Sequence, residues 1–405
     1  MLFRSKSCMK KKNILKKAAH GICIIAAGML ISQTGGAYAS ELQSPTATPV
    51  PTATPAPTTT PAGTETPAPS AKPGIAVNET NFPDSIFRAY VLSGIDTDGD
   101  KVLTEAECKK VTQINVRARD ISNLKGIEYF TELQTLNVSS NKLSKLDVSS
   151  NTKLTYINAS NNDITEAVIA KAVSLRTFLC SGNNLNEIDV KDNKFLDTLD
   201  LSGNKLQDID VSANTRLTSL DISDNALVNL NISANTALDS LDAGSNQLTS
   251  LDLSKNTELS ELNVRDNRIT VIDLSANTSL KTVDCSYNNL ISFVTGEAVE
   301  TLMINNNRLY NVSLAKAVNL KKLNVSGNEL YNLDISANVG LISLNASDNN
   351  LAAVDAKNCP LLTEIAVSGN SREIYVNADG ELYIKDTGID VSKLESLTGA
   401  TLTGE

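Results

Sequence analysis

Aliphatic residues recur with a period of 21 along most of the chain. In each period one residue, usually leucine, is followed by apolar residues three and five positions later, and usually again at ten, thirteen and fifteen. Burying about six apolar side chains offsets less than the entropy lost in ordering one period, so a single period is not stable alone. The pattern therefore predicts short coils that fold only when stacked. The periods start at Val111, Leu133, Leu154, Leu175, Leu196, Leu217, Leu238, Leu259, Leu280, Val299, Leu320, Leu341 and Leu362.

The first apolar positions of each period predict a short strand whose side chains alternate between the core and the surface. The outward positions are mostly Ser, Thr, Asp and Asn, and the larger exceptions are Tyr156, Leu179, Arg265 and Met303. One file of aspartates holds Asp200, Asp221, Asp242 and Asp284, and a second holds Asp147, Asp189, Asp210, Asp252, Asp273, Asp334 and Asp355. These files fit a surface for cations or a basic partner, or a solvated face that keeps the sheet soluble. The scarcity of aromatic anchors favours the solvated face.

Asparagine occupies the position eight after every start from Leu133 onward, and a second row follows ten residues later. A buried amide can donate and accept hydrogen bonds along a stack, so both rows are predicted to be structural. The second row lapses at Ala167–Val173 and Val312–Val318. The first row is Asn141, Asn162, Asn183, Asn204, Asn225, Asn246, Asn267, Asn288, Asn307, Asn328, Asn349 and Asn370, and the second is Asn151, Asn193, Asn214, Asn235, Asn256, Asn277 and Asn338.

The spacing L-x-x-L-x-L-x-x-N-x-L, as in Leu196–Leu206, resembles bacterial leucine-rich repeats of the internalin kind over residues 111–370. The resemblance implies a β-rich, right-handed coil stack that binds a protein, or a glycan, through its surface. Cys180 and Cys285 occupy core positions five coils apart, beyond disulfide reach, and are predicted to be small buried residues. Over residues 371–405, Ile374, Val376, Leu382 and Ile384 alternate around a turn at 377–380, which predicts a β-hairpin cap.

Residues 74–110 precede the repeats and contain one motif with metal-binding chemistry. Asp96 to Glu107 resembles an EF-hand calcium loop, with carboxylates from Asp96, Asp98 and Asp100, a carbonyl at Val102 and a bidentate Glu107. Apolar residues at 86, 87, 90 and 91 predict a helix before the loop, and Thr104 with Glu107 predicts a capping box after it. Lys101 replaces the expected glycine and no second loop is visible. The resemblance implies a helical cap stabilised by Ca²⁺, and an acidic turn without metal is the alternative.

The N-terminal 73 residues have the composition of export and spacer segments. A basic stretch ending at Lys17, an apolar run over 21–31 and Ala37-Tyr38-Ala39 predict a secretory signal peptide at 1–39, too short to remain as a membrane anchor. Residues 40–73 hold nine of the eleven prolines among Thr and Ala, which predicts a disordered linker. The expected mature protein is therefore secreted or loosely associated with the cell wall.

Charge and composition exclude several functions. The only histidine, His20, lies in the predicted signal, so the mature chain would lack imidazole for nucleophile activation or metal binding. Removing the signal leaves 29 basic and 46 acidic residues, a charge of −17 that disfavours nucleic acid. The sequence thus predicts a monomeric, non-enzymatic binding or adhesion module with a protein or surface-glycan partner. The alternatives are a structural cell-wall component and, less favoured, a carboxylate-based glycoside hydrolase accessory protein.

Overall fold

The computed structural model describes residues 74–352 and 354–370, and the backbone of four short strands beyond them. The predicted signal peptide at 1–39 and linker at 40–73 lie outside the described residues. Within the described part, the helices are α1 (Ser85–Gly94) and α2 (Glu105–Lys110), with a 3-10 turn, η1, at Ile127–Tyr129. None of these helices has the length and apolar character needed to cross a membrane.

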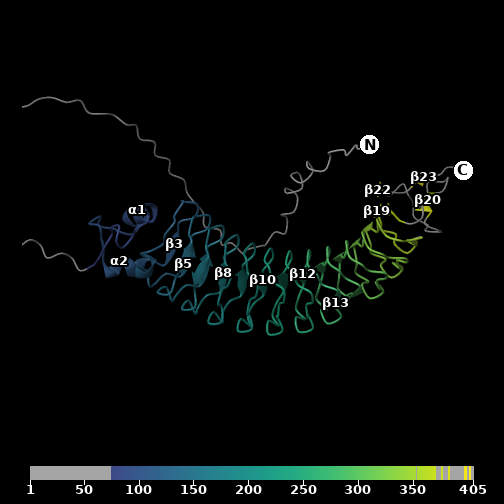
Figure 1. Ribbon diagram of the computed structural model, residues 1–405, viewed down its shortest axis with the longest axis horizontal. Helices are drawn as coiled ribbons and strands as arrows, with labels where there is room; N and C mark the ends of the chain where they lie inside the picture. The colour runs from purple at the N-terminus through teal and green to yellow at the C-terminus, as the bar shows by residue number, and fades with distance from the viewer. Residues whose placement is uncertain are drawn as a thin grey trace, which may run out of the picture. The chain divides into compact units, whose positions relative to one another are not determined.

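The repeats form a parallel β-solenoid of about 12 turns, which confirms the predicted fold class. Figure 1 shows the coils following one another from α2 toward β19. One strand from each coil joins a 14-stranded sheet whose neighbours are all parallel. Its strands are β3 (Gln113–Asn115), β4 (Thr135–Asn137), β6 (Tyr156–Asn158), β8 (Thr177–Leu179), β9 (Thr198–Asp200), β10 (Ser219–Asp221), β11 (Ser240–Asp242), β12 (Glu261–Asn263), β14 (Thr282–Asp284), β16 (Thr301–Met303), β17 (Lys322–Asn324), β18 (Ser343–Asn345), β19 (Glu364–Ala366) and β22 (Ser396–Thr398).

Two pairs of parallel strands lie on the second half of the coils. They are β5 (Lys145–Asp147) with β7 (Glu166–Val168), and β13 (Val271–Asp273) with β15 (Ser292–Val294). The other coils pass this side without a named strand.

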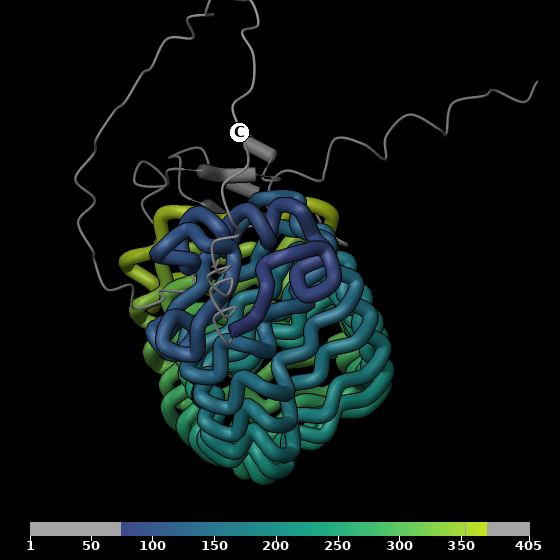
Figure 2. The backbone as a smooth tube through the Cα atoms, turned by 90° about the vertical axis from the view of Figure 1, so that its left-hand side faces the viewer, coloured from purple at the N-terminus to yellow at the C-terminus, as the bar shows by residue number. Residues whose placement is uncertain are grey.

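The core runs the length of the stack because equivalent apolar residues of successive coils lie next to each other. In one coil, Leu217, Leu220, Ile222, Leu227 and Ile232 are all buried, at the periodic positions. Figure 2, viewed along the stack, shows the coils superimposed around this interior. Cys108, Cys180, Cys285 and Cys359 are buried and free, which confirms that Cys180 and Cys285 are unbridged core residues.

The first asparagine row connects neighbouring coils as predicted. Asn267 donates from Nδ2 to the carbonyls of Ala243 and Val264, at 2.9 and 3.1 Å, and its Oδ1 accepts the N–H of Leu248 at 2.9 Å. The Ala243 carbonyl and the Leu248 N–H belong to the preceding coil. Each asparagine side chain therefore bonds backbone groups that the turn would otherwise leave without partners.

The second row is structural but incompletely satisfied. Asn256 is fully buried and donates to the carbonyls of Ile232 and Asn235, at 3.0 and 2.9 Å, while its Oδ1 has no partner. In all seven members of the row, the Oδ1 atom is buried without a hydrogen-bonding partner. Cys359 takes the same place in a later coil, with its thiol 3.6 and 3.5 Å from the carbonyls of Ile335 and Asn338. In each of these residues the side chain contributes a donor to the preceding coil, and the acceptor of the asparagines is not used.

The N-terminal cap packs on the first coil through aromatic side chains. Phe82 lies 6.0 Å from Phe87, 5.8 Å from Tyr129 and 6.5 Å from Phe130, measured between ring centroids. Phe87 and Val91 of α1 are buried as expected, but Ile86 is 38% exposed, so the predicted apolar stripe is wrong at that position. The ten-residue helix buries a narrower face than its sequence suggests, because only one side of it meets the repeats.

The C-terminal strands close the far end of the sheet. β20 (Tyr375–Val376) and β21 (Leu382–Tyr383) pair antiparallel, as the two arms of a hairpin do, and β23 (Thr401–Leu402) pairs parallel to β20. The predicted turn at 377–380, together with Ile374 and Ile384, falls outside the described residues. β22 adds to β19 and so covers an edge that the sequence had not predicted to be paired.

Candidate functional site

Three of the five predicted metal ligands meet in the loop between α1 and α2. Carboxylate oxygens of Asp96, Asp98 and Glu107 lie within 4.8 Å of one another. Asp96 and Glu107 are 7% and 6% exposed, whereas Asp98 is open to solvent. An all-oxygen set of carboxylates, two of them shielded, fits a hard cation such as Ca²⁺.

The other two predicted ligands are not part of this cluster. Asp100 accepts the N–H of Val102 at 2.8 Å, and the Val102 carbonyl belongs to the short strand that follows. Lys101 adopts the left-handed conformation that its position in the loop demands, with φ of 63°. That conformation costs a non-glycine residue about 1–2 kcal/mol, which the surrounding hydrogen bonds must offset.

Glu107 is held firmly by the loop that it closes. Its Oε1 accepts the N–H and the hydroxyl of Thr97, both at 2.7 Å, and its Oε2 accepts the N–H and the hydroxyl of Thr104 at 2.9 and 2.8 Å. The Thr104 N–H and the Thr97 hydroxyl contribute most to lowering the pKa of Glu107 to about 2. The reciprocal bond from the Glu107 N–H to the Thr104 hydroxyl completes the predicted capping box. Glu107 is therefore ionised and aimed into the loop at physiological pH.

A short strand outside the loop pairs with the strand that follows the acidic residues. β1 (Ile75–Ala76) pairs antiparallel with β2 (Val102–Leu103), so that Ile75 faces Leu103 and Ala76 faces Val102. The N–H of Val77 extends the pairing to the carbonyl of Lys101 at 2.8 Å. The loop is thus supported from outside without a partner loop, a feature that sequence analysis missed because two residues give no periodic signal.

The first aspartate file lies in register on the outward face of the 14-stranded sheet, as predicted. Asp200, Asp221 and Asp242 are direct neighbours on β9, β10 and β11, and Asn263 separates them from Asp284. Burial together with the nearby Asp242 and Asp200 raises the pKa of Asp221 to about 6, against the hydrogen bonds from Ser223. Burial likewise raises the pKa of Asp242. This part of the face therefore carries like charges that no described cation balances.

Exposed aromatic residues gather on a different surface, which sequence analysis did not single out. Tyr287, Tyr310 and Tyr331 are 46%, 53% and 66% exposed. Tyr287 lies at the turn that follows β14, whereas Tyr310 and Tyr331 lie at the next bend of their coils. They fall seven or eleven positions after their coil starts, beyond the strand positions at which anchors were sought. The sequence does contain a sign of this surface, since Tyr310 and Tyr331 occupy the same position of consecutive periods.

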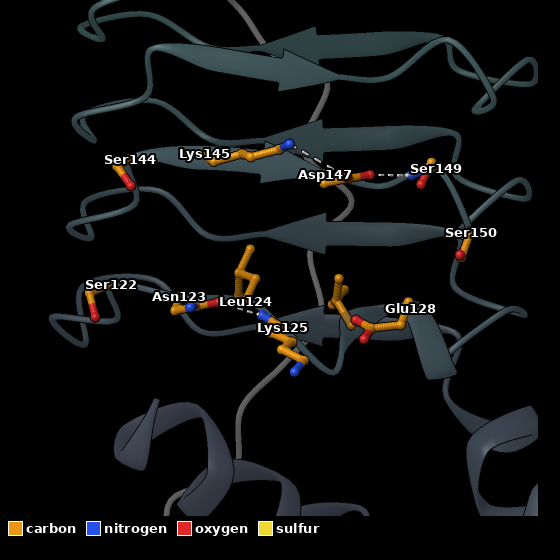
Figure 3. A pocket seen from close by; sticks show the side chains of 11 residues that line it. Ser122, Asn123, Leu124, Lys125, Glu128, Ser144, Lys145, Asp147, Ser149 and Ser150 are labelled. Carbon is orange, nitrogen blue, oxygen red and sulfur yellow. Dashed lines mark hydrogen bonds and ion pairs between the residues drawn. The ribbon is translucent and has the colours of Figure 1, made fainter. Parts of the chain in front are cut away.

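A polar hollow of about 370 Å³ lies beside the first coils. Figure 3 shows Lys145 directed toward Asp147, and Asp147 toward Ser149. Lys145 contacts Glu166 at 2.9 Å and Asp147 at 3.8 Å, and Ser122 donates to Asp84 at 3.0 Å. These side chains are ion-paired or hydrogen-bonded to one another. The lining residues provide no general base placed to activate a nucleophile. The lining is Ser122, Asn123, Leu124, Lys125, Ile127, Glu128, Ser144, Lys145, Asp147, Ser149 and Ser150.

The fold and the asparagine-bonded coils define a parallel leucine-rich-repeat solenoid whose architecture matches internalin-like structures. Residues 82–225 match the family model of the leucine-rich-repeat domain of the endo-β-N-acetylglucosaminidase EndoS. No curated protein sequence matches the chain.

Solved structures similar to this chain include those of bacterial leucine-rich-repeat proteins. The functional domain of InlJ from Listeria monocytogenes, which includes a cysteine ladder, is 27% identical at a TM-score of 0.65, over 82% of this chain and 76% of that one. The internalin inlF from the same organism is 21% identical at 0.65, over 83% and 94%. A leucine-rich-repeat protein of Leptospira interrogans is 18% identical at 0.63, over 78% and 87%. The last two support the fold alone.

Proposed function

We propose that this protein is an exported, non-enzymatic binding module that recognises a protein partner through the surface of its solenoid. The observation that carries this proposal is the continuous outward face of the 14-stranded sheet, whose residues alternate with a fully buried core. A rigid, extended and polar face is suited to recognition over many side chains. A surface glycan is a second candidate for the same role.

An enzymatic role is disfavoured by how the carboxylates are arranged. Asp200, Asp221 and Asp242 repeat with the coil, so they form a row along the sheet and not one isolated pair. Acid–base catalysis by paired carboxylates needs two groups with different environments, one protonated and one ionised. A repeated row of aspartates is expected of a surface that binds a partner or keeps the protein soluble.

We further propose that Ca²⁺ binds the loop between α1 and α2 and stabilises the N-terminal cap. Asp96, Asp98 and Glu107 would hold the ion, and Asp100 with the Val102 carbonyl would complete the set after a local adjustment. The ion would neutralise carboxylates that otherwise repel one another within 4.8 Å. Its role would be structural, because the loop lies at one end of the solenoid.

Export is proposed on the basis of the signal-like N-terminus and the Pro/Thr-rich spacer. The mature protein would be secreted or held loosely at the cell wall as a monomer. Its charge of −17 would disfavour contact with nucleic acid.

The experiment that tests the proposed function is saturable binding. The purified protein is immobilised and exposed to bacterial-surface and host-surface protein extracts, and captured proteins are then titrated individually against the soluble chain. We expect at least one partner with a single saturable isotherm that excess soluble chain competes away. If every captured protein binds without saturation, the chain is a structural wall component and the binding proposal fails.

A further inference from the structure

The exposed aromatic residues of the C-terminal coils share one edge of the solenoid, which we call the tyrosine edge. It consists of Arg268, Tyr287, Ile291, Arg308, Tyr310 and Tyr331. Ile291 donates its N–H to the Thr270 carbonyl, Arg308 to that of Leu290 and Tyr331 to that of Tyr310. These bonds place Ile291, Arg308 and Tyr331 beside the preceding coil, so that Ile291, Tyr310 and Tyr331 follow one another on consecutive coils. Tyr287 lies four positions earlier in its coil than Ile291.

Two tyrosine rings on this strip are open to solvent, and one of them is held by a hydrogen bond. Tyr310 and Tyr331 are 53% and 66% exposed. The Tyr310 hydroxyl is hydrogen-bonded to Glu329, and this bond, together with the charge of Glu329 and the neighbouring Tyr331, raises the pKa of Tyr310. Rings held before a ligand arrives lose little entropy on binding. Neighbouring coils are about 4.8 Å apart, so the rings form a stepped apolar platform.

Planar polar groups run beside the rings. The position nine after each start holds Arg268, Asn289, Arg308, Glu329 and Asn350 in consecutive coils. Guanidinium, amide and carboxylate groups each present two hydrogen-bonding atoms in one plane. Arg308 and Glu329 therefore provide donors and acceptors next to Tyr310, in a chain whose surface is otherwise strongly acidic.

The neighbouring Tyr287 is supported in a similar way. The Arg265 guanidinium lies 4.5 Å from the centroid of the Tyr287 ring, which fixes the ring on the side of the sheet face. At the positions equivalent to Tyr310 and Tyr331, the earlier coils carry Ser144, Thr165, Asn186 and Gln207. The aromatic platform is thus confined to the later coils and is not a property of the repeat.

We propose that the tyrosine edge binds a neutral, linear oligosaccharide. The C–H face of a pyranose ring is attracted to the negative face of an aromatic ring, and its hydroxyls pair with planar amide, guanidinium and carboxylate groups. A neutral chain meets no repulsion from a protein of net charge −10, and mixed charges beside the rings suit hydroxyls better than an ionic ligand. This site is separate from the outward sheet face through which a protein partner is proposed to bind.

Titration with defined sugars tests the proposal. The probes are cellohexaose, chitohexaose, maltohexaose and mannohexaose, followed by calorimetry and by intrinsic tyrosine emission, which no tryptophan masks. We expect at least one probe to bind and to change the emission. Tyr310→Ala and Tyr331→Ala should each weaken binding about 3- to 10-fold. Tyr331→Phe should retain affinity, since the ring face and not the hydroxyl contacts the sugar.

The control is Val228→Ala, at the equivalent turn of an earlier coil, which should leave affinity unchanged. All three altered side chains are exposed, and circular dichroism verifies that the variants fold. The proposal is overturned if no probe binds at about 10 mM. It is also overturned if Tyr310→Ala with Tyr331→Ala binds as tightly as the parent, or if only anionic chains such as heparin bind. A saturable protein partner could still be found in each of these cases, so the proposed function would stand or fall separately.

Discussion

At the residue scale, the two asparagine rows illustrate how one side chain can be indispensable in one turn and replaceable in another. Asn267 satisfies both a carbonyl and an N–H of the preceding coil, whereas Asn256 satisfies carbonyls only and buries an unpartnered oxygen. The chain itself places Ala172 and Ala317 in the second row, and never replaces the first row from Asn141 onward.

Asn267→Ala should therefore destabilise the protein more than Asn256→Ala. The first change leaves the Leu248 N–H without a partner and the Ala243 carbonyl with only the Asn246 amide, and should cost about 1–3 kcal/mol. The second also removes an unsatisfied oxygen, and should cost about 1 kcal/mol or less. Urea denaturation of both variants measures the difference, and equal losses would contradict the distinct roles of the rows.

Thr97 determines how readily the Glu107 carboxylate can reorient toward a bound metal ion. The four hydrogen bonds from Thr97 and Thr104 fill the lone pairs of the Glu107 carboxylate. Thr97→Val removes the hydroxyl bond to Oε1 and keeps the shape of the side chain. Calcium affinity by calorimetry should rise about 2- to 5-fold in this variant. Weaker binding would mean that the Thr97 hydroxyl helps to hold the ion.

The acidic file on the sheet makes stability depend on pH. Because the pKa of Asp221 is raised to about 6 by burial and by its neighbours, folding is opposed above that pH and favoured as pH falls toward the unfolded value of about 3.8. Asp221→Asn keeps the acceptor for Ser223 and removes the charge. The free energy of unfolding should rise by on the order of 1 kcal/mol at pH 7, and the gain should vanish near pH 4.

Asp210→Asn is the matched control for this prediction. Hydrogen bonds from the hydroxyl and N–H of Ser212 lower the pKa of Asp210, which lies on the exposed second half of a coil. Loss of the Asp210 charge should therefore not raise the free energy of unfolding at pH 7. A similar gain in both variants would mean that net charge, and not the row on the sheet, governs the effect.

At the element scale, each turn after a sheet strand depends on the turn of the coil before it. Asn306 has φ of 56°, and its Oδ1 would lie 2.8 Å from a Cβ atom at Gly327, whose φ is 64°. Gly203 has a similar φ of 62°, but its nearest neighbour would be 3.4 Å away. The Asn306 side chain therefore lies close to where a Cβ atom at Gly327 would be, and no such contact exists at Gly203.

Gly327→Ala should consequently cost more than Gly203→Ala. Both variants bear the left-handed backbone penalty of about 1–2 kcal/mol, and only the first also pushes against Asn306. The double variant Gly327→Ala with Asn306→Gly should recover the excess, as measured by thermal unfolding. No recovery would show that the two turns are energetically independent.

The sequence predicts the elements well where a period exists. The strands, the first asparagine row and the capping box at Thr104 follow from spacing alone. The prediction that Ile86 is buried is wrong, because the buried face of a helix is defined by the elements that pack against it. β1, β22 and the orphaned oxygens of the second row depend on contacts between distant segments, and the tyrosine edge becomes visible only once the coils are stacked in register.

At the scale of the whole molecule, the stack is stable only if its ends are covered. Asp84 joins the cap to the repeats, since its carboxylate accepts the N–H groups of Ile86 and Phe87 in α1 and that of Ser122 in the first coil. Any ion that orders the loop between the helices therefore also supports the first coil. Cap and repeats should unfold as one unit at this end.

The most direct test of this account is a calcium titration of the whole protein by calorimetry and thermal unfolding, with Glu107→Gln as the matched variant. Binding should be weak, with a Kd of about 10⁻⁴–10⁻³ M, because a lysine stands at position 101 and no second loop supports the site. A 10-fold excess should stabilise the cap by about 1.4 kcal/mol, a chelator should reverse it, and Glu107→Gln should abolish most of the response. Magnesium should have a smaller effect. Absence of calcium heat, with unfolding unchanged by chelator, would contradict a metal-stabilised cap and leave the loop as an acidic turn.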